Sequence, residues 1–359
     1  MNTTSPWQRT IAISTAFLAV IAAGIVVHNL GGILIPFILA GFISIVFNPF
    51  VRKMRSKHIP TAVAILMVMI IAGGSLWLVS IILSLGVNSF VENSAFYSHQ
   101  LKVVIADVER SMGYVLRSVG TKGSIKLASI VTSEAIISFA TSQVSTILGL
   151  VGDSVMILLF LLFMLAASEA FPSKILVAFD EHSGAKVLST FETLSTKVRR
   201  YLVMKTLFAL TNGIIAWLVL SAFGVDFAPL FGLLTFMFQY IPNIGSMIST
   251  TIPATVFLLQ TGSIGSAGAL ALTLTVIQNL LGNLVEPKVI GDQLRLSPVV
   301  VLFALVFWGW MWGIVGMVLS IPIMSFCKVL LEIFPSTRPI AVLMGSAVGT
   351  KPVPEMAKH

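Results

Sequence analysis

The chain contains 359 residues, of which 57% are hydrophobic and only 10% are charged. Because a soluble domain carries about 25% charged residues, this composition excludes a soluble protein and predicts an all-α protein with several transmembrane helices. The net charge of +8 does not indicate a nucleic-acid partner, since the basic residues lie in loops without interleaved aromatic residues. The single cysteine, Cys327, excludes a disulfide within the chain and a cysteine-based metal site.

Six apolar stretches have the length of a membrane-spanning helix, which needs roughly 20 residues. They are 10–28, 31–51, 61–87, 146–168, 202–223 and 264–284. We interpret the first as a retained span and not as a signal peptide, because its start is weakly basic and a second apolar run follows almost at once. The loop Val51–Pro60 is rich in lysine and arginine and contains no acid. It therefore indicates that this loop and the N-terminus are cytoplasmic.

The polar regions between the spans have a helical spacing of apolar residues. His99–Arg117 and Ile125–Val144 are expected to form extracytoplasmic amphipathic helices, and 169–201 is expected to contain a cytoplasmic one. We expect such helices to pack on the membrane surface or on a neighbouring subunit. The predicted domains are N-terminal scaffold helices (1–87), extracytoplasmic amphipathic helices (88–145), a span with an amphipathic helix (146–201), a transport core (202–334) and a cytoplasmic tail (335–359).

Two further apolar segments, Phe227–Leu259 and Leu296–Leu331, are too long for one simple span and too short for two. Each is interrupted in its middle, the first at Pro242-Asn243-Ile244-Gly245 and the second at Gly309–Gly313. Irregular backbone at membrane depth is tolerated only where it is buried in protein or lines a cavity. Paired broken segments therefore indicate a transport site.

The two broken segments match each other at an offset of 69 residues. Pro229 falls on Pro298, and Pro253 falls on Pro322. The spans that precede them also align, so we predict two units, each a span plus a broken segment, in an inverted repeat as in elevator-type transporters. The positive charges after the last full span favour re-entrant hairpins, while kinked full spans stay open.

Neutral polar residues gather in these units and are the candidate substrate ligands. They are Gln239, Tyr240, Asn243, Gln278, Asn279 and Asn283. Amide groups and the free backbone groups of a broken helix suit a small neutral hydroxylated solute better than a bare ion. The alternative is that the amides join helices to one another. The candidate hinge residues are Pro242, Gly245, Gly309, Gly313 and Gly316.

Ionisable residues inside a bilayer are costly and are therefore functional candidates. Glu286 and Asp153 are the candidates for ion coupling, although Lys288 could neutralise Glu286. Lys205 lies near a span end and is interpreted as an anchor. Motifs for catalysis, metal binding or cofactor binding are missing: the histidines are scattered and there is no Walker A loop. We therefore expect neither an enzyme nor a cofactor.

The C-terminal third resembles the autoinducer-2 exporter family. The resemblance rests on Ile241–Gly245, on Glu286–Gly291 with Leu296-Ser297-Pro298, and on the aromatic run from Phe307 to Met317. It implies a bacterial inner-membrane permease with both termini in the cytoplasm and a homo-oligomeric assembly, a pentamer among the forms it allows. Many members carry an acid where this chain has Leu281, which weakens an ion-exchange role. The aromatic run, with Trp310, could pack on a sugar-like ring.

The favoured function is that of a secondary transporter that exports a small neutral signalling molecule such as the quorum-sensing autoinducer-2. Its expected partners are this small molecule, the lipid bilayer and other copies of the chain. The first alternative is a sodium–proton antiporter of the same family, which would use Glu286 and Asp153. The second is a non-transporting oligomeric scaffold or passive pore, which would leave the broken helices unexplained.

Overall fold

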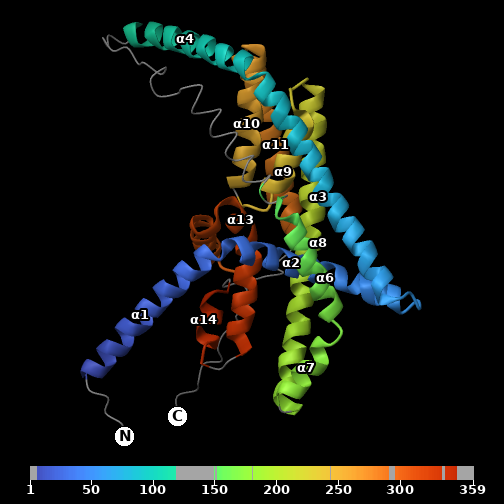
Figure 1. The fold of residues 1–359 in the computed structure, drawn as a ribbon. Coiled ribbons are helices and arrows are strands. Elements are labelled where there is room, and N and C mark those ends of the chain that lie inside the picture. Colours follow the sequence, from blue (N-terminus) through green and yellow to red (C-terminus); the bar gives the residue numbers. More distant parts are fainter. Residues whose placement is uncertain are drawn as a thin grey trace, which may run out of the picture. The chain divides into compact units, whose positions relative to one another are not determined.

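The computed structural model describes residues 6–118, 149, 152–179, 181–242, 244–290, 296–333 and 336–345. Regular structure in these ranges is helical (Figure 1), apart from one isolated bridge between Leu296 and Gly345. The elements are α1 (Pro6–Asn29), α2 (Gly31–Arg55), α3 (Thr61–Glu92), α4 (Ser94–Ser118), α6 (Ser154–Ala167), α7 (Phe171–Ala178), α8 (Glu181–Ala222), α9 (Ala228–Phe238), α10 (Ile244–Thr261), α11 (Ile264–Leu280), the π-helix η2 (Leu281–Val285), α12 (Glu286–Ile290), α13 (Pro298–Ile333) and α14 (Arg338–Leu343).

Seven helices in the described ranges are long and apolar enough to cross a membrane, or up to eight if α6 and α7 form one bent span. Many of their large apolar side chains are exposed, among them Phe17 of α1, Trp77 of α3 and Phe163 of α6. Lipid-facing helices expose such side chains because hydrocarbon, not water, surrounds them. The prediction of an all-α, multi-pass membrane protein is confirmed.

Within the predicted amphipathic region 169–201, α7 is a separate helix, and the residues from Glu181 onward continue into the predicted span 202–223 as one helix, α8. α6 bends by 65° into α7, and α8 then runs without interruption for 42 residues, about 63 Å. No glycine or proline occurs between Ala185 and Asn212, so nothing in the backbone ends the helix where its surface changes from polar to apolar. The predicted span 202–223 therefore corresponds to the C-terminal half of α8.

The chain divides into two compact units. Unit 1 comprises Met1–Thr61, Met156–Ser195 and Arg295–His359, and unit 2 comprises Ala62–Val155 and Thr196–Leu294. Unit 2 therefore contains α3, α4, the membrane part of α8 and the helices α9 to α12. Unit 1 contains the helices α1 and α2, α7, and both α13 and α14.

The core of unit 2 forms where α10 packs against α9 and α11 (Figure 1). Leu220, Phe231, Phe257 and Leu270 are among its buried residues. Tyr97 in the first turns of α4 belongs to the same core, so this end of α4 packs on its own chain. The second expected amphipathic helix, Ile125–Val144, lies outside the described residues.

Glycines allow the helices of unit 2 to approach closely. A Cβ on Gly213 of α8 would lie 2.8 Å from the carbonyl oxygen of Gly232, and a Cβ on Gly232 would lie 2.6 Å from the Cβ of Trp217. Only glycine leaves room for this crossing of α8 and α9, which is how small residues act between membrane helices. The crossing holds the first broken segment against α8.

The first broken segment is a helical hairpin. α9 ends at Phe238, α10 begins at Ile244, and α10 packs back against α9. At Gly245 the two arms come so close that a Cβ would overlap the carbonyl oxygen of Phe238. The break therefore lies between Phe238 and Ile244. It starts three residues before the predicted Pro242–Gly245, and Gly245 closes the hairpin.

The second broken segment, α13, also folds back on itself. Trp312 and Gly313 have non-helical backbone angles, and Gly313 has a φ of +63°, a conformation that glycine adopts readily. A Cβ on Gly316 would overlap the carbonyl oxygen of Trp308. In a continuous helix residues eight apart are separated by about 12 Å, so this contact requires the chain to double back. Both predicted breaks are present, and each is closed by a glycine against a carbonyl.

Candidate functional site

A row of polar side chains is buried along the membrane part of α8. Tyr201 is 7% exposed, Lys205 is 3% exposed and Asn212 is 1% exposed. Spacings of four and seven residues place all three on one face of a helix. Because charged and amide groups are costly to bury without partners, this face must meet polar groups from elsewhere in unit 2.

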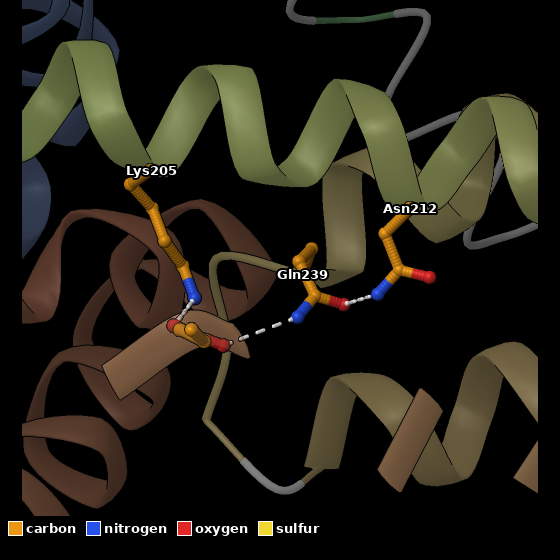
Figure 2. A network of polar contacts seen from close by, with 4 residues as sticks. Lys205, Asn212 and Gln239 are labelled. Atoms are coloured by element: carbon orange, nitrogen blue, oxygen red, sulfur yellow. Dashed lines mark hydrogen bonds and ion pairs between the residues drawn. The ribbon is translucent and has the colours of Figure 1, made fainter. Parts of the chain in front are cut away.

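These partners come from the hairpin break and from α12. Lys205 forms an ion pair with the Oε1 carboxylate oxygen of Glu286, and Figure 2 shows the side chains of Lys205, Gln239 and Asn212 in this set of contacts. Gln239 donates from Nε2 to the other carboxylate oxygen of Glu286 at 3.4 Å. Asn212 donates from Nδ2 to Oε1 of Gln239 at 2.8 Å. The amide of Gln239 thus joins the ion pair to the amide on α8, and these four residues are called the polar network below.

The sequence around Glu286 explains its position. The chain forms the π-helix η2 directly before Glu286. Such π-helical segments are rare in proteins, and those that occur often lie at functional sites. Because a π-helix closes i→i+5 bonds, each turn takes up about one extra residue. Gln278 and Glu286 are eight residues apart, and the extra residue brings them back to about the same face. Gln278 is 5% exposed, which agrees with that placement.

Three buried polar atoms in the described part of unit 2 have no hydrogen-bond partner there. They are Oδ1 of Asn212 and both amide atoms of Gln278. An unsatisfied buried polar group costs about 1–3 kcal/mol, and native proteins contain few of them. This part of unit 2 therefore offers one donor and two acceptors that the fold itself leaves unused.

The structure distributes the predicted ligands unevenly. Gln239 and Glu286 meet in the polar network, and Tyr240 shares a 2.7 Å hydrogen bond with Thr206 of α8. Asn279 and Asn283 are exposed within the chain and bond to each other at 3.0 Å, so they do not share the buried face of Gln278. Asn243 lies outside the described residues.

Two other candidates lie apart from the polar network. Asp153 is exposed in the turn before α6, and among the described residues it makes no side-chain contact with Glu286. Trp310 is 74% exposed and stacks on His28 with ring centroids 6.0 Å apart. The contact of Trp310 lies within unit 1, at the second break.

Contacts from the α1–α2 junction surround that second break. His28 donates from Nδ1 to the carbonyl oxygen of Met311 at 2.7 Å, and Trp312 donates from Nε1 to the carbonyl of Val27 at 3.3 Å. A Cβ on Gly31 would lie 3.1 Å from the Trp312 ring. The break frees carbonyls that a continuous helix would satisfy, and His28 caps one of them.

Sequence reasoning missed the role of Lys205. Lys205 was expected to act as an anchor, and Lys288 was expected to neutralise Glu286. The structure shows the reverse, because Lys205 is buried and paired while Lys288 is exposed. The signal was present in the spacing of Tyr201, Lys205 and Asn212, which defines a polar face on an otherwise apolar helix.

The comparison with known proteins gives the family. The model of the AI-2E family of transporters matches residues 15–336. The chain belongs to the AI-2E transporter family. A curated relative, the AI-2 transport protein TqsA of Escherichia coli K12, is 32% identical over 337 residues, which cover 93% of this chain and 95% of TqsA.

The names of the other relatives are less specific about the substrate. YhhT of Escherichia coli K12, named only provisionally as a transport protein, is 30% identical over 93% of this chain and 94% of its own. A provisionally named transport protein of Haemophilus influenzae is 30% identical over 87% of this chain and 90% of its own. Membership in the AI-2E family therefore identifies a transporter without identifying what it carries.

Proposed function

We propose that this AI-2E family member is a secondary transporter that exports a small, neutral, hydroxylated signalling molecule such as autoinducer-2. The observation that carries the proposal is the set of unpartnered amide atoms on Asn212 and Gln278, which are buried in apolar helices of unit 2. A solute with several hydroxyl groups can donate to and accept from these atoms. Hydrogen bonds from such a solute would satisfy amide atoms that the fold itself leaves unpaired.

The charge balance of the site supports a neutral solute. Lys205 and Glu286 pair with each other, so their charges cancel locally and neither is left for an ionic substrate. The remaining groups of the site are the amides of Asn212, Gln239 and Gln278, which suit hydroxyl groups. The name of TqsA, an AI-2 transport protein, supports autoinducer-2 as the first substrate to test.

The proposed mechanism moves the bound solute between the two membrane faces. The break between Phe238 and Ile244 lies next to Gln239, and Asn243 stays a predicted ligand within it. Gly245 closes the first hairpin and Gly316 closes the second, so both hairpins have defined hinges. We further propose an elevator-like movement of an inverted repeat, a homo-oligomer in the bacterial inner membrane, and cytoplasmic termini.

Replacing Gln278 by leucine tests this function. The two side chains are similar in size, and the leucine would leave no buried amide unpaired at this position. We expect Gln278→Leu to raise the thermal unfolding midpoint of the purified protein and to lower autoinducer-2 efflux from proteoliposomes at least tenfold. If Gln278 only supported the fold, its replacement would lower both the stability of the protein and its transport activity.

Gln260→Leu is the matched control. The amide of Gln260 donates to the carbonyl of Gly224 at 2.8 Å and accepts from the backbone of Asp226 at 3.1 Å, so its removal should lower stability and leave efflux per folded protein unchanged. Full efflux by Gln278→Leu would show that the unpartnered amide does not serve the substrate.

A second function, sodium–proton exchange, is favoured by one observation. Glu286 is an acid beside a buried lysine within the membrane part of the chain, and such pairs occur in proton relays. Glu286→Gln should then abolish sodium-driven proton movement in proteoliposomes. If the chain exports a neutral solute without coupling to protons, this exchange is absent in the wild-type protein as well.

A further inference from the structure

A pocket of about 590 Å³ opens at the junction of α3 and α4. The last turns of α3, the first turn of α4 and the residues that lead into α9 line it. All of these belong to unit 2, and none belongs to the polar network. The volume lies within the range of small-molecule sites, about 300–1,000 Å³.

The polarity of the pocket changes along α3. Ile82 and Leu85 line one end, and Ser89 and Asn93 line the other. These residues are spread over about 16 Å of chain at 1.5 Å per residue. Leu230 of α9 adds to the apolar end, and Asp226 adds to the lining. An elongated ligand with an apolar chain and a polar head matches this gradient.

The carboxylate of Asp226 is held in place but is not neutralised. Tyr97 donates from its hydroxyl to Oδ2 of Asp226 at 2.6 Å, and no lysine, arginine or histidine in the described part of the chain forms an ion pair with this carboxylate. Burial, and then the hydrogen bond and negative charge of Asp226, raise the pKa of Tyr97 well above its ordinary value. Tyr97 therefore stays a donor, and the negative charge lacks a counter-ion within the described part of the chain.

Aromatic rings lie beside this carboxylate. Phe96, Tyr97 and Phe227 all line the pocket, and the Tyr97 ring is 5.4 Å from Phe96 and 6.0 Å from Phe227 between centroids. Phe227 has a φ of +60°, a strained conformation for a bulky residue. Aromatic rings next to an acid are the arrangement that binds ammonium groups.

We propose that this pocket binds the ammonium group of an amphiphile, with Asp226 as its counter-charge and the aliphatic side chains of α3 and α9 against its hydrocarbon chain. The ammonium group can belong to a membrane lipid headgroup or to a free amphiphilic amine. Both contain one positively charged ammonium group and at least one apolar chain. The proposal does not depend on the transported solute.

Native mass spectrometry of the full-length protein in detergent tests the proposal. The probes are phosphatidylethanolamine, phosphatidylcholine and phosphatidylglycerol with identical acyl chains, because all three carry a phosphate and only the first two carry an ammonium group. We expect the two ammonium lipids to be retained over phosphatidylglycerol. Asp226→Asn should reduce this preference about fivefold, the size expected of a partly exposed ion pair.

Glu92→Gln is the matched control, since it removes a carboxylate at the end of α3 that does not line the pocket, and it should leave the preference unchanged. Should Asp226→Asn fail to fold, Tyr97→Phe keeps the ring and removes only the hydroxyl that orients Asp226, with a smaller loss expected. Displacement of the lipid by decylammonium chloride assigns the site to a free amine, and its failure assigns the site to a lipid headgroup. Equal retention of all three lipids, or an unchanged preference without Asp226, overturns the proposal.

Discussion

At the scale of single residues, the ion pair between Lys205 and Glu286 is the contact whose disruption we expect to be most costly in free energy. Lys205 is 3% exposed, and removing one partner of a buried ion pair typically costs about 3–5 kcal/mol because the other charge stays buried alone. The carboxylate side is partly exposed, with 25% of the Glu286 side chain accessible, so solvent screening reduces the effect. We therefore expect a loss at the lower end of this range.

Glu286→Gln should lower the free energy of unfolding by about 3 kcal/mol, since it leaves the Lys205 ammonium group without its counter-charge. Lys205→Met combined with Glu286→Gln should recover most of that loss, because no buried charge then remains. Denaturant unfolding of both variants in detergent micelles measures the difference. If the double variant is no more stable than Glu286→Gln alone, the ion pair with Lys205 does not explain the contribution of Glu286 to stability.

Several residues of the polar network could be predicted from the sequence, and others could not. Gln239 and Glu286 were candidates because amides and acids are rare within apolar segments. Lys205 was assigned to the membrane surface because a lysine near a span end can extend its side chain to water. Its true depth depends on the length of α8 and on the position of Glu286, both of which are properties of the fold.

At the scale of elements, the two hairpin breaks depend on close backbone contacts at glycines. Gly245→Ala and Gly316→Ala would each place a Cβ against a backbone carbonyl oxygen, of Phe238 and Trp308 respectively. Backbone cannot move aside as a side chain can, so each should destabilise the protein by about 3 kcal/mol, the upper end for overpacking, and should impair transport.

Gly268→Ala in α11 is the matched control for both variants, because a Cβ there meets nothing within 4 Å. An alanine in a helix interior stabilises by up to about 1 kcal/mol relative to glycine. Thermal unfolding and efflux of the three variants compare the sites. Normal stability and transport of Gly245→Ala would contradict the close approach of α9 and α10.

The cap on the second break gives another prediction for this element. His28→Ala leaves the carbonyl oxygen of Met311 without its donor, and Met311 is 3% exposed, so the loss should be about 1 kcal/mol. We expect faster hydrogen exchange of the backbone amides just after Trp312. Asn29→Ala, at the neighbouring exposed position of α1, should leave exchange there unchanged, and equal exchange in both variants would exclude a capping role for His28.

The limits of sequence reasoning are also visible in these elements. Both breaks were predicted because proline and glycine interrupt apolar segments. The hairpin geometry was not settled, since it depends on whether the two arms pack together. The continuity of α8 was missed because a change from polar to apolar surface was taken as a boundary, although no residue there ends a helix.

Two facts combine at the scale of the whole molecule. The chain is a multi-pass membrane protein of the AI-2E transporter family, and its membrane part contains buried amide atoms that its own fold leaves unpaired. A scaffold function would leave the unpaired amide atoms unexplained, and a passive-pore function would leave the two closed hairpins unexplained. The proposed export of a neutral hydroxylated solute accounts for both.

The most direct measurement is the flux of autoinducer-2 from proteoliposomes that contain this protein, with and without an imposed pH gradient. The account predicts flux above that of empty liposomes, and loss of this flux in both Gln278→Leu and Asn243→Ala. The response of the flux to the gradient reports whether Glu286 and Lys205 couple transport to protons. The absence of flux, together with sodium-driven proton movement in the same vesicles, would contradict the account and establish the antiporter in its place.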